Sequence, residues 1–245
     1  MAIDDRSQRA HRPFQVSAWR GNQQIAVLSP APDRPSPGVA AVGVELVRLR
    51  AMGVERVLTG ALHRNELAPF LATGFTEHER LHLLRHDLLH LPEITHPVRT
   101  RRAWKRDMPG ILAIDERAFD EFWALDRRGL EDAVRATPIS RFRITRQPGE
   151  PVIGYAVTGQ AADRGYLQRL AVDPAHHRQG IGRALVADAL TWLKQHGARS
   201  AMVNTQERNV SALSLYRTCG FVEESSGLTV LRLDLGTFPP DAGGA

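Results

Sequence analysis

The stretch His177-Arg178-Gln179-Gly180-Ile181-Gly182-Arg183-Ala184-Leu185 joins two segments of different hydrophobic pattern. Before it lies a short apolar run, Tyr166 to Val172, and after it an amphipathic run, Ala184 to Gln195. This order predicts a strand, a glycine-rich loop and a helix. Such a loop leaves N–H groups unpaired at a helix N-terminus, where the helix dipole favours negative charge. Glycine at 180 and 182 lets a ligand approach the backbone, so the stretch is predicted to bind an anion such as a pyrophosphate.

A second block, Asn209-Val210-Ser211-Ala212-Leu213-Ser214-Leu215-Tyr216-Arg217-Thr218-Cys219-Gly220-Phe221, follows a predicted strand at 201–205. Asn209 is a typical helix N-cap, and the spacing of Ala212, Leu215 and Tyr216 predicts one helical face. Gly220 stands where a helix end requires a left-handed residue, and the next predicted strand begins after it. The block therefore predicts a strand, a helix and a strand in that order.

Together the two blocks resemble the GCN5-related N-acetyltransferase (GNAT) superfamily. Its acetyl-CoA loop has the form Gln/Arg-x-x-Gly-x-Gly/Ala, and its next helix has the form Asn-x-x-Ala-x-x-Leu-Tyr-x-x-x-Gly-Phe. The second block fits at every stated position, whereas the first departs at His177, where the family has Gln or Arg. The resemblance implies an α/β (α+β) GNAT fold, with a central mixed, mostly antiparallel sheet flanked by helices.

The resemblance also implies acetyl-CoA as co-substrate and assigns its contacts. The backbone of Leu170, Ala171 and Val172 is expected to pair with the pantetheine arm, which requires this strand to diverge from its neighbour. Asn209 is expected to reach the same arm, and Tyr216 to protonate the CoA thiolate, since a phenol pKa near 10 is close to that of a thiol. The pyrophosphate is expected on the loop residues His177, Arg178, Gln179, Gly180, Ile181, Gly182, Arg183 and Ala184.

The general base is less clearly indicated than the acid. Asp126 and Glu207 are the candidate carboxylates, and each is also compatible with an ordinary surface charge. Asp115 and Glu116 are expected on a solvated helix face. The aromatic pair Phe122-Trp123 is expected either to line the acceptor pocket, as the resemblance implies, or to cover the sheet edge as core residues.

The predicted activity is N-acetyl transfer to a primary amine by direct attack in a ternary complex. The acceptor class stays open between a small-molecule amine and a protein N-terminus or lysine. The alternative is a non-catalytic acyl-CoA-binding sensor or scaffold, which the departure at His177 and the absence of a clear base motivate.

An internal repeat organises the chain. A shift of 144 residues brings Pro30 onto Pro174, Gly38 onto Gly182, Gly53 onto Gly197, Asn65 onto Asn209 and Leu71 onto Leu215. The first copy is degraded at the part that corresponds to the anion-binding loop 177–184, which we call the cradle. There Ser36 replaces Gly180, and its neighbours Pro35 and Pro37 carry no N–H. A chance match between two similar strand-helix-strand segments is the alternative. The repeat predicts a truncated, non-catalytic GNAT-like half that packs on the second, either as an intramolecular pseudo-dimer in a monomer or within a homodimer.

The predicted domain boundaries follow from this repeat and from composition. They are a disordered N-terminus at 1–12, a degenerate GNAT-like domain at 13–91, a linker at 92–97, a GNAT domain at 98–236 and a flexible tail at 237–245. The strand at 228–235 is expected to complete the GNAT domain. The other expected elements of that domain are a strand at 98–104, helices at 108–119 and 129–136, strands at 141–145, 152–159 and 166–172, and a helix at 183–195.

Composition limits the remaining function classes. The chain has 245 residues and a formal net charge of +5, but its basic residues are almost all arginines, scattered except at 99–102, which does not favour a nucleic-acid partner. It has no run of about 18 apolar residues and no N-terminal signal pattern, so no membrane association is expected. One cysteine, Cys219, is compatible with a reducing compartment, and a cytoplasmic location is expected.

Four histidines, His78, His82, His86 and His90, recur at intervals of four. On a helix they would share one face and suggest a metal site. The repeat instead lays Leu81 to Leu88 over the strand at 228–235, and residues four apart on a strand are separated by roughly 13 Å. No metal is therefore expected.

Overall fold

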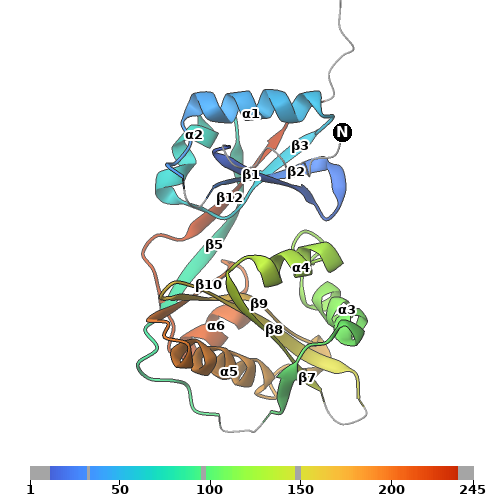
Figure 1. Ribbon diagram of the computed structural model, residues 1–245, viewed down its shortest axis with the longest axis vertical. Helices are drawn as coiled ribbons and strands as arrows, with labels where there is room; N and C mark the ends of the chain where they lie inside the picture. The colour runs from blue at the N-terminus through green and yellow to red at the C-terminus, as the bar shows by residue number, and fades with distance from the viewer. Residues whose placement is uncertain (1–11, 32–33, 95–97, 147–149, 237–245) are drawn as a thin grey trace, which may run out of the picture. The chain divides into compact units, whose positions relative to one another are not determined.

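The structure is a computed structural model that describes residues 12–31, 34–94, 98–146 and 150–236. It divides the chain into two compact units, the first made of residues 1–82 with 225–245 and the second of residues 83–224. Apart from Arg12, the predicted disordered N-terminus and flexible tail lie outside the described residues, as do the last three residues of the predicted linker. Figure 1 labels most of the helices and strands of both units.

The first unit is built on a sheet in the order β1-β2-β3-β12-β5. Strands β2 and β3 run parallel on either side of the helix α1 in the sequence, and the other pairs of this sheet are antiparallel. Its elements are β1 (Phe14–Trp19), β2 (Asn22–Pro30), α1 (Val39–Ala51), β3 (Arg56–Thr59), β4 (Leu62–His63), the 3-10 turn η2 (Arg64–Glu66), α2 (Leu67–Leu71), β5 (Thr76–His86) and β12 (Leu228–Asp234).

The core of the first unit lies between α1, α2 and the sheet. Val42, Leu46 and Leu49 are buried on one face of α1, as their spacing along the helix requires. Phe70 of α2 packs edge-on against Phe14 and Phe75, with ring centroids 6.2 and 5.5 Å away. The unit therefore has a hydrophobic core of its own.

The predicted boundary at 98–236 places the closing strand β12 in the second unit. The structure places it in the first. It pairs with β3, β4 and β5, and the structure assigns residues from Ser225 onward to the first unit. Leu231 and Leu235 join the core of that unit. The physical reason is that an alternating pattern specifies which face of a strand is buried, while leaving open which sheet edge accepts it.

The second unit carries a sheet in the order β10-β9-β8-β7-β6, mostly antiparallel, with β9 and β10 parallel. The predicted mixed, mostly antiparallel sheet flanked by helices is confirmed. The elements are β6 (Thr100–Arg102), η3 (Lys105–Asp107), α3 (Met108–Ala118), α4 (Arg127–Arg135), β7 (Ile139–Arg146), β8 (Val152–Ala161), β9 (Arg164–Val172), η4 (Pro174–His176), α5 (Ile181–Gln195), β10 (Ser200–Gln206), α6 (Val210–Thr218) and β11 (Val222–Glu223), which pairs with the end of β5.

Helices cover both faces of this sheet (Figure 1). On one face, α3 and α4 pack through Ile111, Ile114 and Leu130 against Tyr155. On the other, α5 and α6 form a core with Leu185, Leu190, Val203, Leu213 and Phe221. Strand β8, buried over nearly its whole length, contributes to both cores. The crossover β9-α5-β10 therefore rests on a sheet that is covered on both sides.

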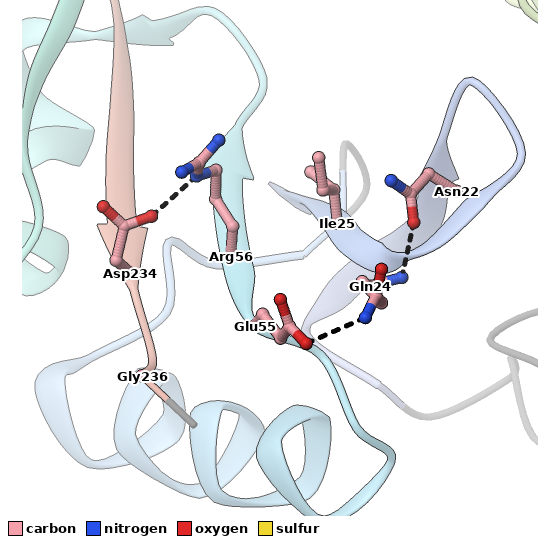
Figure 2. A pocket seen from close by; sticks show the side chains of 7 residues that line it. All are labelled: Asn22, Gln24, Ile25, Glu55, Arg56, Asp234 and Gly236. Atoms are coloured by element: carbon pink, nitrogen blue, oxygen red, sulfur yellow. Dashed lines mark hydrogen bonds and ion pairs between the residues drawn. The ribbon is translucent and has the colours of Figure 1, made fainter. Parts of the chain in front are cut away.

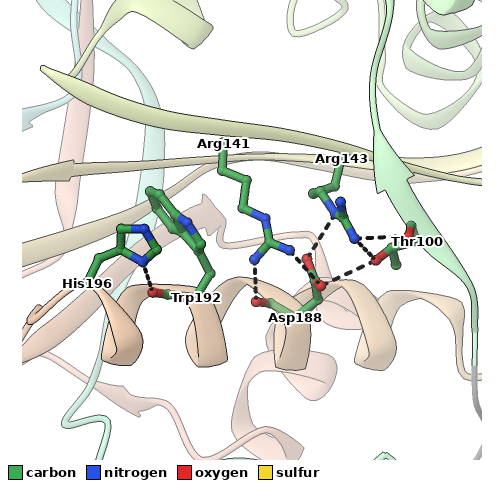
Figure 3. A network of polar contacts seen from close by, with 6 residues as sticks. All are labelled: Thr100, Arg141, Arg143, Asp188, Trp192 and His196. Atoms are coloured by element: carbon green, nitrogen blue, oxygen red, sulfur yellow. Dashed lines mark hydrogen bonds and ion pairs between the residues drawn. The ribbon is translucent and has the colours of Figure 1, made fainter.

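A polar network holds α5 against the sheet edge (Figure 3). Asp188 of α5 accepts from Arg141 Nη2 of β7 at 3.1 Å and from Thr100 Oγ1 of β6 at 3.2 Å. Arg143 donates to Thr100 Oγ1 at 2.7 Å, and its Nε lies 3.6 Å from Asp188 Oδ2. Burial lowers the pKa of Arg141, partly offset by the charge of Asp188. The network fixes the helix whose first turn follows the glycine-rich loop.

Candidate functional site

Strands β9 and β10 are paired only where they begin. Their parallel register joins Arg164, Gly165 and Tyr166 to the first three residues of β10, Ser200 to Met202. Beyond Tyr166, β9 continues to Val172 without a recorded partner on this side, although both strands lie in the described part of the chain. The expected divergence beside Leu170, Ala171 and Val172 is therefore present, and it leaves one backbone edge of β9 open over residues 167–172, which we call the open segment.

A β-bulge lies at the point where β9 turns away. Val157 of β8 pairs with Arg169, whereas Thr158 pairs with Leu167, so Gln168 is the extra residue. A bulge bends its strand and increases the local twist. The bulge lies two residues after Tyr166, the last residue of β9 that pairs with β10, so its bend fits the divergence of the two strands there.

The glycine-rich loop supplies unpaired N–H donors next to this opening. The loop is fully described, and the N–H groups of residues 178–183 donate to no protein acceptor recorded there. Arg178 and Gly180 have φ values of 63° and 77°, a left-handed conformation that glycine adopts without cost. Residues 177–180 are exposed. Free donors at the start of a 15-residue helix fit an anion such as a pyrophosphate.

Two of the predicted cradle residues are occupied within the protein. The Ala184 N–H donates to the Gly180 carbonyl at 3.0 Å, so it belongs to the helix and is unavailable to a ligand. The His177 N–H donates to the Pro174 carbonyl at 3.3 Å, and its ring Nε2 lies 3.1 Å from the Val172 carbonyl. For that contact to be a hydrogen bond, Nε2 must carry the proton. His177 thus ties the loop to the end of β9.

Gly182 has a packing role as well as a place in the cradle. A Cβ atom added at this position would lie 3.0 Å from Leu215 Cδ2, which is closer than side chains normally approach. Leu215 belongs to α6 and directly precedes Tyr216. The absence of a side chain at 182 therefore lets the glycine-rich loop and the tyrosine helix pack together.

Asn209 caps α6 as expected. Its side-chain oxygen accepts from the Ala212 N–H at 3.1 Å, which satisfies one of the donors at the start of the helix. The cap uses the oxygen only, so the amide N–H groups of this half-buried side chain are left for another acceptor.

Tyr216 is buried, with 5% of its surface exposed, and its ring packs 5.7 Å from that of Phe221. No described residue shares a hydrogen bond with its hydroxyl, and the hydroxyl is not among the fully enclosed unpaired atoms, so it retains contact with solvent. Burial raises the pKa of Tyr216, an effect that the positive charge of Arg169 partly opposes. The phenol is therefore protonated at neutral pH, as a general acid must be, but its raised pKa makes it a weaker acid and a poorer match to a thiol than the ordinary phenol pKa predicts.

The two candidate bases differ in their surroundings. Asp126 is the N-cap of α4, and its Oδ1 accepts from the Gly129 N–H at 2.7 Å, so this carboxylate has a structural task. Glu207 is exposed on the turn that follows β10, at the end where β9 and β10 have separated. The prediction of a base at either position is not tested by these contacts, but Glu207 is the one whose oxygens no recorded bond engages.

The aromatic pair lies in the loop between α3 and α4, residues 119–126, which we call the α3–α4 loop. Phe122 and Trp123 are half-buried and meet edge-to-face, with ring centroids 5.1 Å apart. The Trp123 carbonyl accepts from Arg169 Nη2 at 2.8 Å. Because Arg169 lies on the open segment of β9, this bond joins the α3–α4 loop to the strand expected to hold the acetyl donor.

The expectation that Asp115 lies on a solvated helix face is wrong. Its side chain is fully buried, and it accepts from Arg169 Nε at 2.8 Å, from Arg169 Nη2 at 2.7 Å and from the hydroxyl of Tyr155. The sequence did contain a signal, because Asp115 stands four residues after Ile111 and therefore shares its buried face. Glu116, one residue further, is exposed as expected.

The first unit has no equivalent of this opening among its described residues. Strands β2 and β3 stay paired from Ile25–Arg56 to Leu28–Thr59, and the Gly60 N–H still reaches the Leu28 carbonyl at 3.3 Å. Pro35 and Pro37 occupy the corresponding loop and carry no N–H. The open backbone edge of the second unit is therefore absent from the described part of this half, and two of the loop's N–H donors are missing.

The first unit does contain a pocket of about 300 Å³ (Figure 2). It lies where β2 and β3 begin, whereas the glycine-rich loop follows the end of β9. Its polar side chains bond one another: Arg56 Nε lies 2.6 Å from Asp234 Oδ1, and Gln24 Nε2 donates to Glu55 Oε1 at 2.8 Å. This pocket is therefore no counterpart of the cradle.

The described part of the chain offers neither a metal-binding cluster nor a membrane-spanning helix. It contains no cluster of three or more His, Cys, Asp or Glu side chains able to hold a metal ion. His78, His82 and His86 lie on the strand β5, and the strand that the repeat predicts over Leu81 to Leu88 contains the last two of them. None of the helices described is long and apolar enough to cross a membrane.

Comparison with known sequences agrees with this geometry. The family model described as Acetyltransferase (GNAT) family matches residues 101–221. The ribosomal protein bS18-alanine N-acetyltransferase of Escherichia coli (strain K12) is 30% identical over 117 residues, which are 48% of this chain and 76% of the relative. N-alpha-acetyltransferase 30 of Xenopus laevis is 37% identical over 79 residues, 29% of each chain.

Solved structures show that the fold extends beyond the matched region. A tandem GNAT protein from the clavulanic acid biosynthesis pathway aligns with a TM-score of 0.66 at 15% identity, over 89% of this chain and 77% of its own. A GCN5-related N-acetyltransferase from Sphaerobacter thermophilus aligns with a TM-score of 0.63 at 16% identity, over 91% and 76%. At these identities the likeness concerns the fold alone.

Proposed function

Because the chain belongs to the acetyltransferase (GNAT) family, we propose that its second unit transfers an acetyl group from acetyl-CoA to a primary amine by direct attack in a ternary complex. The observation that carries this proposal is the open edge of β9 beside the unpaired N–H groups of residues 178–183. An extended amide-containing arm can pair with such an edge as an added strand does, and the adjacent donors suit a pyrophosphate.

The open segment of β9 would hold the acetyl donor through its backbone. Residues 170–172 offer N–H and C=O groups to the pantetheine arm, and an N–H there would polarise the acetyl carbonyl and stabilise the oxyanion that forms on attack. The amide of Asn209 would donate to the same arm. Acetyl-CoA supplies the activated acyl group, and this chain supplies its orientation.

Tyr216 would donate a proton to the departing thiolate. Its hydroxyl is protonated, has no competing partner among the described residues and keeps contact with solvent. On the other side of the reaction, Glu207 would take the proton of the incoming ammonium group, directly or through water, since amines are protonated at neutral pH. This assignment rests on the exposed carboxylate at the end of β10 and on the engagement of Asp126 in a helix cap.

We propose a protein N-terminus as the acceptor to examine first. The relative at 30% identity is named a ribosomal protein bS18-alanine N-acetyltransferase, and the relative at 37% identity is named an N-alpha-acetyltransferase. An N-terminal amine has a pKa of about 7.7–8.0, so it needs less help from a base than a lysine does. Such an amine suits a site in which a single exposed carboxylate is the candidate base, because little help with deprotonation is needed.

Calorimetric titration of acetyl-CoA into the full chain tests the binding half of the proposal. We expect one site per chain, because the described part of the first unit lacks the opening and has two prolines in the corresponding loop. Gly180→Val should abolish binding, since valine strongly disfavours a φ of 77°. Gly38→Val is the matched control: Gly38 is also a helix N-cap, but its φ is −81° and a Cβ there meets nothing within 4 Å.

Release of free thiol with a peptide that carries an N-terminal alanine tests the chemical half. Turnover that depends on the peptide supports the transferase. Binding of acetyl-CoA without thiol release from any amine would instead identify an acyl-CoA sensor. Two sites per chain, or loss of binding with Gly38→Val, would contradict the assignment of the cradle to the second unit.

A further inference from the structure

Asp115 and Arg169 form a buried pair whose hydrogen bonds converge on the α3–α4 loop. The Asp115 carboxylate accepts from Arg169 Nε, Arg169 Nη2, the Tyr155 hydroxyl and the Leu125 N–H, the last at 2.5 Å. A carboxylate has about four lone-pair sites, so its acceptor capacity is filled. Its side chain is 0% exposed and that of Arg169 is 11% exposed, so water competes little for these bonds.

Arg169 reaches the same loop by two further contacts. Its Nη2 donates to the Trp123 carbonyl at 2.8 Å, and its guanidinium carbon lies 3.4 Å from the centre of the Phe119 ring. The Leu125 N–H donates to Asp115. The pair therefore contacts the loop near its start, its middle and its end. Two of these contacts fix Phe119 and Leu125 on either side of the Phe122-Trp123 pair, and the third holds the backbone carbonyl of Trp123 itself.

Arg169 belongs to β9, the strand expected to hold the acetyl donor. Arg169 stands immediately before Leu170, on the part of β9 that β10 does not cover. Its charge also acts on Tyr216, the proposed acid. A buried ion pair contributes little net stability compared with well-packed apolar residues, so fixing one arrangement of the loop is the better account of its presence.

We propose that Asp115 and Arg169 are positioning residues for acetyl transfer, which hold the α3–α4 loop against the open segment of β9 so that an acceptor amine meets the acetyl group in one orientation. The proposal rests on the proposed function for its kinetic consequence. Its structural consequence, an α3–α4 loop that loosens when the pair is broken, stands without it.

A second ion pair in the same unit, with a buried carboxylate and an arginine side chain that is 31% exposed, provides the control. Arg101 donates to both oxygens of Asp107 at 2.7 and 2.6 Å, and Asp107 also accepts from the Trp104 N–H at 2.8 Å. Asp107 is 6% exposed and precedes α3, the helix that carries Asp115. Breaking this pair costs a comparable set of bonds without touching the α3–α4 loop.

The test compares Asp115→Asn and Arg169→Lys with Asp107→Asn and Arg101→Lys in the full chain. Hydrogen exchange should rise in the peptide covering residues 119–126 only for the first two variants. With the N-terminal alanine peptide as acceptor, its KM should rise between about tenfold and a hundredfold for the same two, as expected for a misplaced binding element. The dissociation constant of acetyl-CoA should stay within about twofold for all four, because the cradle is untouched.

Arg169→Lys keeps the charge and serves if Asp115→Asn does not fold. Unchanged exchange at 119–126 in both test variants, or a rise that the control variants share, overturns the proposal. A loosened loop with unaltered KM and kcat overturns the positioning role as well. If the wild-type chain neither binds acetyl-CoA nor releases thiol, the proposed function fails, and the exchange result still decides whether the pair holds the loop.

Discussion

Gly182 and Leu215 are in such close contact that a Cβ atom on the glycine would lie 3.0 Å from Leu215 Cδ2. Gly182 belongs to the first turn of α5, where the unpaired donors are, and Leu215 precedes Tyr216 on α6. The lack of a side chain at 182 lets the helix that carries Tyr216 approach the glycine-rich loop, and under the proposed function it would also keep the backbone accessible to a ligand. The two motifs that define the family are joined at this point.

Gly182→Ala should lower the free energy of unfolding by about 1–3 kcal/mol through overpacking, even though alanine is the better helix former. Leu215→Ala should relieve the clash, so the double variant should be more stable than the sum of the two single changes predicts. Denaturant unfolding of the four proteins measures this coupling. Strictly additive effects would show that Leu215 moves aside freely and that the contact does not constrain residue 182.

Tyr216→Phe should reduce kcat by about a hundredfold, the lower range for loss of a general acid. The dissociation constant of acetyl-CoA should change little, because the proposed contacts of the donor are with β9, the loop and Asn209. The stability should also be nearly unchanged, since the hydroxyl makes no hydrogen bond within the described residues. Thiol-release kinetics and calorimetry on the same samples separate these quantities.

A wild-type kcat in Tyr216→Phe would remove this residue from the mechanism. A variant with lowered stability and lowered affinity would instead indicate that the hydroxyl organises the site.

Arg178→Gly removes the charge at position 178 of the cradle without introducing backbone strain. Arg178 has a φ of 63°, which glycine adopts without cost, but glycine also adds freedom to the unfolded chain, so stability should change by less than about 1 kcal/mol. Loss of the exposed cation should weaken acetyl-CoA binding about fivefold at low salt, close to the upper limit for a solvent-exposed charge. Calorimetry at two salt concentrations should show a smaller salt dependence in the variant.

Arg199→Ala is the control for general electrostatic attraction, because Arg199 is exposed just before β10, where that strand is still paired with β9. An equal loss of affinity in both variants would mean that net charge, and not the cradle, attracts the ligand.

The elements around the cradle were predictable because their residues carry specific backbone requirements. Asn209 caps α6 and Gly180 has a positive φ, and such needs can be read from residue type and position. The separation of β9 from β10 came only from the family resemblance. No local pattern in Tyr166 to Val172 states where a neighbouring strand stops pairing.

The two predictions that were wrong, on Asp115 and on β12, have different physical causes. The burial of Asp115 followed from its helical spacing, but a carboxylate is usually placed on the surface, and its partner Arg169 lies 54 residues away. The partners of β12 could not be predicted, since antiparallel pairing depends on which edge is free in the folded sheet. Residue pattern defined the faces in both cases, whereas the long-range partner required the structure.

His86 is buried at the end of β5, with 2% of its surface exposed. Its Nδ1 accepts from the Leu88 N–H at 2.9 Å, and its ring packs 5.1 Å from that of Phe221. Burial lowers the pKa of His86 from 6.5, and the nearby charge of Lys194 acts in the same direction. Asp87 and a hydrogen bond to the Cys219 backbone raise the pKa, but to a smaller extent than burial lowers it. The imidazole is therefore neutral in the folded protein near pH 6.5.

The sign of the pH dependence follows from this lowered pKa. Below about pH 6.5 the unfolded chain takes up a proton on His86 that the folded chain does not, so the free energy of unfolding falls as the pH is lowered from there towards the folded-state pKa. Urea unfolding of wild type and His86→Gln at several pH values between about 5 and 7.5 measures this contribution. The variant should be less stable at pH 7.5 because it loses buried packing, but its stability should decline less between pH 6.5 and pH 5. His90→Gln, a change at an exposed position four residues on, should retain the wild-type pH dependence. Parallel curves for wild type and His86→Gln would show that protonation of His86 is not coupled to unfolding.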